Sequence, residues 1–85
     1  MNPEDIKQRI RDGLPGCDVT VSGDGSHFEA IVVGDVFDGL TAVKRQQLVY
    51  GTINELITSG ALHALTIKSY TPAEWATASK LQISS

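Results

Sequence analysis

The stretch Leu62–Trp75, Leu-His-Ala-Leu-Thr-Ile-Lys-Ser-Tyr-Thr-Pro-Ala-Glu-Trp, decides the fold of this chain. Residues 65–68 alternate apolar with polar side chains, which predicts a strand with one buried face. Thr71 then fits an N-cap, with Pro72 at the first helical position and Glu74 closing a capping box. The segment therefore predicts a strand that runs directly into a well-capped helix.

A histidine, His63, stands at the mouth of this strand. The chain has only one other histidine, His27. A lone histidine at a strand entrance is more often a hydrogen-bonding residue than a metal ligand, although imidazole serves both purposes. The residue types alone leave both interpretations of His63 open.

Two further helices are indicated by caps and by apolar spacing. Asn2 caps the first, with Pro3 at its first position, and that helix ends at Gly13–Gly16. The longer one runs from about Thr41 or Ala42 to Ser59 and stops at Gly60. Apolar residues at helical spacing predict its buried face: Val49, Ile53, Leu56 and Ile57.

Two more strands are predicted, at Cys17–Ser22 and Phe28–Val33. The short loop Gly23–His27 between them makes an antiparallel hairpin the expected pairing. The apolar run Ile31–Val33 favours a central, buried position for the second strand. The order α-β-β-α-β-α predicts an α+β fold, a single domain over residues 1–85 with a three-stranded sheet covered on one face by helices.

Composition limits the classes of function. With 85 residues, 41% of them apolar, the chain is long enough for one small globular core. It has no apolar run long enough for a membrane span and no secretory signal, and its one cysteine, Cys17, excludes an internal disulfide, so we expect a cytoplasmic protein. The net charge of −3 is unfavourable for a domain that grips phosphates.

Five motifs follow one another along the chain: Ser26-His27-Phe28, Phe37-x-Gly39, Arg45-x-x-x-Val49-Tyr50, His63-Ala64-Leu65 and Thr71-Pro-x-Glu-Trp75. In this order they resemble the motifs of the BolA family, and the resemblance covers roughly residues 4–80. The loop Val21–Phe28 is most similar to the bacterial IbaG branch, and Gln46 where other members often carry histidine favours the same branch.

The resemblance implies a fold related to the type II KH domain and a cytosolic monothiol glutaredoxin as partner. In the family, the pair shares a bridging [2Fe–2S] cluster, for which glutaredoxin and glutathione supply thiolates. The family's histidine before the third strand corresponds to His63. A second ligand from the hairpin loop corresponds to His27, with Asp24 as an oxygen alternative. Two imidazoles can replace two thiolates on one iron, but neither histidine can hold a cluster alone.

Four other residues are candidates for partner contact or chemistry besides the two histidines: Lys44, Arg45, Lys68 and Trp75. Lys44 and Arg45 form a basic pair on a helix face that can steer a partner, and Lys68 adds to it. Trp75 is expected mainly to anchor the last helix, with partner contact secondary. Cys17 is expected to be a half-buried residue of ordinary reactivity. We find no nucleophile–base pair, so an enzyme is not expected.

Two rival functions stay open at this stage. Nucleic-acid binding is suggested by the KH-like fold, by the Gly-x-x-Gly spacing of Gly13–Gly16 and by a patch of Lys44, Arg45, Lys68 and Lys80. The acidic balance and the helix-stop interpretation of Gly13–Gly16 argue against it. The third candidate is a bare interaction module that binds glutaredoxin without a cluster.

Overall fold

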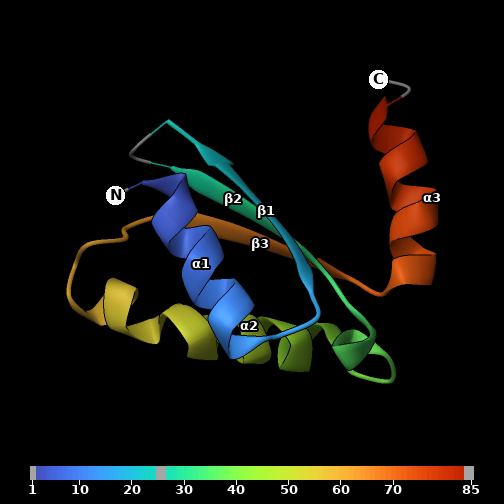
Figure 1. Cartoon of the computed structure of the whole chain (residues 1–85), viewed down its shortest axis with the longest axis horizontal. Coiled ribbons are helices and arrows are strands. Elements are labelled where there is room, and N and C mark those ends of the chain that lie inside the picture. Colours follow the sequence, from blue (N-terminus) through green and yellow to red (C-terminus); the bar gives the residue numbers. More distant parts are fainter. Residues whose placement is uncertain (1, 25–26, 84–85) are drawn as a thin grey trace.

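The computed structural model describes residues 2–24 and 27–83, the last three by their backbone alone, so Gly25 and Ser26 of the predicted hairpin loop lie outside it. The predicted order of elements is confirmed (Figure 1). The elements are α1 (Pro3–Gly13), β1 (Asp18–Gly23), β2 (Phe28–Val33), a short 3₁₀ turn η1 (Asp35–Phe37), α2 (Ala42–Thr58), β3 (Leu65–Tyr70) and α3 (Pro72–Ile83).

The sheet has the order β1-β2-β3, with β2 in the centre as its apolar sequence predicts. β1 and β2 pair antiparallel, which confirms the predicted hairpin, whereas β2 and β3 run parallel. In the parallel pair Phe28 lies opposite Leu65. The residues just ahead of both strands therefore lie at the same end of the sheet.

One face of the sheet packs against α1 and α2 and forms the core. The α1 stripe of Ile6, Ile10 and Leu14 is buried, as its fourfold spacing predicts. Ile57 departs from the prediction, because its side chain is 38% exposed. It lies about 100° further round the helix than the buried Leu56, beyond the edge of the apolar stripe. The core is completed by Val19, Phe28, Ala30, Val32, Phe37, Val49, Ile53, Leu62 and Ile67.

The last helix stands apart from this core. Figure 1 shows α3 beyond the end of the sheet, and β3 is the element that it chiefly contacts. Its start is the predicted capping box, since Thr71 N donates to Glu74 Oε1 at 2.8 Å and Glu74 N donates to Thr71 Oγ1 at 3.2 Å. Trp75 anchors it to the end of β3, with its ring 5.2 Å from that of Tyr70.

None of the helices in residues 2–24 and 27–83 has the length and apolar character that a span of the bilayer needs.

Candidate functional site

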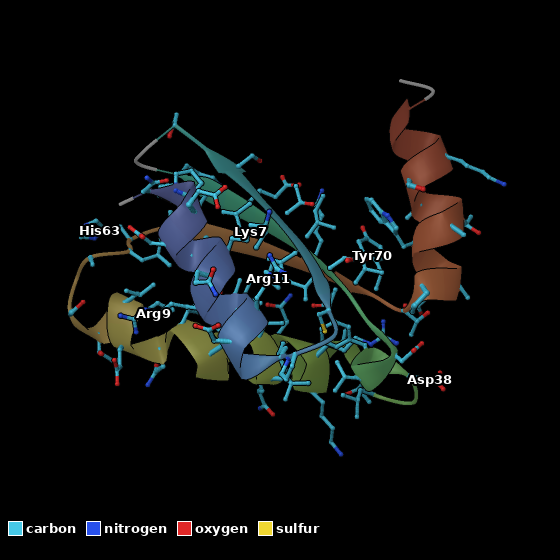
Figure 2. All side chains as sticks on the ribbon, viewed as in Figure 1. Lys7, Arg9, Arg11, Asp38, His63 and Tyr70 are labelled. Carbon is cyan, nitrogen blue, oxygen red and sulfur yellow. The ribbon has the colours of Figure 1, made fainter. Side chains whose placement is uncertain are left out.

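The fold brings the two histidines together. His27 immediately precedes β2 and His63 lies just before β3, and the parallel pairing puts both strand starts at one end of the sheet. Phe28 N donates to Ala64 O at 3.1 Å, which ties the two approaches to each other. Both histidines line one cavity of about 360 Å³. Figure 2 shows His63 at the end of the molecule opposite Tyr70.

The backbone around His63 is fixed while its side chain is exposed. Gly60 takes a positive φ of 80° and ends α2, as predicted. Leu62 then returns to the core with only 3% of its surface exposed, and its N–H donates to Leu56 O at 3.0 Å. An exposed imidazole on a firmly held backbone is available to a ligand or partner without local unfolding.

The hairpin loop gives its two candidate ligands different roles. Asp24 Oδ1 accepts from His27 N at 3.0 Å, and Asp24 N donates to His27 O at 3.3 Å, so Asp24 closes the loop. The imidazole of His27 is exposed, with Nε2 3.5 Å from Thr66 Oγ1, at the outer limit of a hydrogen bond. In this arrangement the Asp24 carboxylate bonds to the loop backbone, whereas the His27 imidazole is exposed.

Glycine at position 23 lets the end of β1 lie close to the backbone of His27 and Phe28. A Cβ at this position would collide with the carbonyl oxygen of His27 and with Phe28, so a side chain here would push the loop away from β2. Glycine at this position therefore positions His27 through the backbone.

Two apolar side chains of α2 complete the wall of the histidine cavity. Tyr50 and Ile57 line it and are 36% and 38% exposed. Sequence reasoning missed both as site residues, because it assigned Ile57 to the core and used Tyr50 only as a family marker. The sequence did contain a signal for this surface: Val43, Tyr50 and Ile57 are spaced seven residues apart, which places all three on one side of a helix.

The donor set at this end consists of two imidazoles. Across the part of the chain that the structure describes, no group of three or more histidine, cysteine, aspartate or glutamate side chains converges on a point that could hold a metal ion. Two neutral imidazoles suit iron, zinc and copper, but these metals usually take four or more ligands. A metal ion bound by these two imidazoles would need further ligands beyond those that the described residues bring together.

Arg45, expected to contact a partner, forms its hydrogen bonds within the chain. Its guanidinium contacts both carboxylate oxygens of Glu74, at 2.6 and 3.3 Å, and its Nε donates to Leu40 O at 3.1 Å. The hydrogen bond from Arg45, helped by the backbone N–H of Thr71, lowers the pKa of Glu74 to about 2. This cluster joins α2 to the start of α3.

The other residues considered for partner contact also lie away from the histidine cavity. Lys68 Nζ is 3.5 Å from Glu29 Oε1 on the sheet face opposite the core, and Lys44 is exposed near the start of α2. Trp75 is half-buried beside Tyr70. None of these three, nor Arg45, lines the cavity that His27 and His63 share.

The Gly13–Gly16 segment is the end of α1 and the turn into β1. A Cβ on Gly13 would collide with the Thr52 side chain, so Gly13 lets α1 and α2 approach closely. Gly16 has a φ of 92°, which suits glycine. Cys17 follows as a half-buried residue; burial, and then the charges of Asp18 and Asp35, raise the pKa of its thiol.

Comparison with known proteins places these features in a family. The sequence profile of BolA-like proteins matches residues 9–74. The acid stress protein IbaG of Escherichia coli (strain K12) is 49% identical over 81 residues, covering 95% of this chain and 96% of IbaG. A bolA protein homologue from Coxiella burnetii has a TM-score of 0.80 at 43% identity, covering 89% of this chain and 97% of that structure. BolA1 from Arabidopsis thaliana has a TM-score of 0.74 at 30% identity, covering 87% and 96% of the two chains. The chain belongs to the BolA family.

Proposed function

We propose that this chain is the non-catalytic partner of a cytosolic monothiol glutaredoxin, with which it shares a bridging [2Fe–2S] cluster in iron–sulfur trafficking or in iron or stress regulation. In this proposal His63 and His27 supply two ligands, and the glutaredoxin cysteine and glutathione supply two thiolates. The observation that carries it is the meeting of both histidines in one cavity, at one end of the sheet.

The chemistry of the donors fits this group. Two imidazoles on one iron, with thiolates on the other, is an established ligand pattern for [2Fe–2S] clusters. The described residues offer half of such a set, which accords with a cluster held between two proteins. When bound, the cluster supplies iron and sulfide for transfer, while His63 and His27 hold it and release it.

Imidazole ligands also make the holding of a cluster sensitive to acid. A protonated imidazole ring cannot bind a metal, so protons compete with iron for a histidine ligand. A cluster held by His63 and His27 is therefore expected to be released as the pH falls. The acid-stress name of the relative from Escherichia coli accords with a response in this direction.

Nucleic-acid binding, the rival function, has less support. Gly13 packs against Thr52, which gives the Gly-x-x-Gly spacing a structural purpose. Arg45 is held by Glu74, and Lys68 lies beside Glu29. If the regulator interpretation is correct, affinity for a DNA duplex should be tight and should fall steeply with salt. Weak affinity at all salt concentrations accords with the glutaredoxin partner.

The direct test mixes the chain with a monothiol glutaredoxin, glutathione, iron and sulfide under anaerobic conditions. We expect the two proteins to elute together with bound iron and sulfide, and the visible spectrum to differ from that of glutaredoxin alone. Co-elution without iron would favour the bare interaction module. No co-elution and an unchanged glutaredoxin spectrum would overturn the proposal.

A further inference from the structure

Three exposed apolar side chains follow one side of α2. Val43, Tyr50 and Ile57 are spaced seven residues apart, and they are 65%, 36% and 38% exposed. Seven residues make nearly two helical turns, so the three side chains lie within about 40° of one another around the helix. Tyr50 and Ile57 line the histidine cavity, whereas Val43 lies nearer the other end of α2 and does not.

The two imidazoles leave a bound metal group short of ligands, and this indicates which kind of molecule covers the cavity wall formed by Tyr50 and Ile57. The described residues at the cavity supply two imidazoles, so the other ligands of a bound metal group belong to a second molecule. Bonds between metals and their ligands are only about 2–2.5 Å long. The second molecule must therefore approach to within contact of the cavity rim, where Tyr50 and Ile57 are exposed.

The character of these two side chains suits an interface. Tyrosine combines a large apolar ring with a polar hydroxyl and is enriched among the residues that dominate binding energy. Ile57 offers an aliphatic surface beside it, and Leu62 and Leu65 extend the same lining inward. Apolar side chains next to the ligands would also exclude water from the metal–imidazole bonds once a partner covers them.

We propose that Tyr50 and Ile57 form the anchoring surface for the protein that completes the ligand set of His27 and His63. The partner presents an apolar patch directly beside its own thiolate ligand, and this patch packs on Tyr50 and Ile57. The proposal rests on the glutaredoxin function proposed above, and it assigns the contact to the C-terminal half of α2.

The test compares the double variant Tyr50→Ala/Ile57→Ala with the matched control Val43→Ala, which removes an exposed apolar side chain from the same helix. Each protein is titrated into cluster-loaded glutaredoxin, and the change in visible circular dichroism is followed. We expect the midpoint to move at least tenfold higher for the double variant and less than twofold for the control. The spectrum at saturation should stay that of the wild type, because both histidines remain.

A second measurement does not depend on substitution. In methyl NMR spectra of the wild-type chain, the Ile57 resonance should shift or broaden when loaded glutaredoxin is added, while the Val43 methyl resonances should not. Equal titration midpoints for the double variant and wild type, or an unaffected Ile57 resonance, would overturn this surface while leaving the proposed function intact. Absence of any spectral change with the wild-type chain would overturn both proposals.

Discussion

The two ends of β3 differ in how their polar and charged side chains are used. At its start, His63 and His27 are exposed and share a cavity with the half-exposed Tyr50 and Ile57. At its end, Thr71 is buried in a capping box, and the guanidinium of Arg45 is occupied by Glu74 and Leu40. At the end of β3 these side chains bond to one another and to the backbone of the chain, whereas at its start both imidazoles are exposed.

This difference separates the residues proposed to bind another molecule from the residues that stabilise the fold. Arg45 was expected at a partner surface, yet it joins α3 to α2 through Glu74, whereas Trp75 anchors α3 to β3 as mainly predicted. His63, which the sequence already singled out, has an exposed side chain between two hydrogen-bonded backbone neighbours, so it is the better candidate for binding another molecule. Substitutions at the two ends should therefore have opposite effects on cluster binding and on stability.

The largest effect is expected from His63→Ala. Because this removes a proposed ligand, the amount of cluster held with glutaredoxin should fall at least about a hundredfold, since even residues that only orient a ligand contribute 10–100-fold. The free energy of unfolding should change by less than about 0.5 kcal/mol, because the side chain is exposed. Iron content and urea unfolding measure the two quantities. Full retention of the cluster by this variant would show that the histidine end is not the site.

A smaller effect is expected in the hairpin loop. His27→Ala should lower cluster retention about tenfold or more, because it removes the second proposed imidazole. Asp24→Asn is the matched control, since asparagine keeps the oxygen that accepts from His27 N. It should change retention less than threefold. The opposite ranking of the two variants would make Asp24 the ligand.

At the other end of β3, Thr71→Ala should destabilise the fold and spare the cluster. Loss of the N-cap hydroxyl costs about 1 kcal/mol in unfolding free energy. Thr77→Ala, an exposed change within the same helix, is the control and should be nearly neutral. Both variants should retain the cluster in the glutaredoxin mixture as the wild type does. A loss of cluster in Thr71→Ala but not in Thr77→Ala would contradict the prediction that the end of β3 affects stability without affecting cluster binding.

The smallest effect concerns pH. The pKa of Glu74 is lowered from 4.5 to about 2 in the folded chain, so its ionised form stabilises the fold. That contribution is complete above about pH 4.5 and is lost as the pH falls towards 2. Glu74→Gln, which keeps the cap acceptor, should lack this part of the acid dependence of unfolding, and Arg45→Met should weaken it. An acid dependence identical to that of the wild type in both variants would contradict the role of the ion pair.

Local sequence signals predicted most of the fold, and the caps show why. Asn2 and Thr71 each accept from a backbone N–H of the next helix, as predicted, so short-range chemistry was enough to locate these two helix starts. The cap of α2 at Thr41 was not predicted as such. β2 matched its predicted bounds, whereas β1 is shifted by one residue. The parallel pairing of β2 with β3 had no local signature, because it depends on how α2 crosses the sheet.

The candidate site could be predicted only in part from the sequence. The family resemblance pointed to His63 and His27, but their meeting in one cavity depends on the register between Phe28 and Leu65. Ile57 was misassigned because its spacing fits both the buried stripe and the row of Val43 and Tyr50. The engagement of Arg45 with Glu74 joins residues far apart in the chain, and no local pattern predicts such a pair.

In the proposed function, histidine nitrogens of this chain bind the shared cluster. The most direct measurement labels only this chain with ¹⁵N-histidine, assembles it with unlabelled glutaredoxin and glutathione, reduces the cluster, and records nitrogen couplings by pulsed electron paramagnetic resonance. Binding by His27 and His63 predicts strong ¹⁵N couplings from two directly bound imidazoles. A reduced cluster in the complex without any strong ¹⁵N coupling would contradict it.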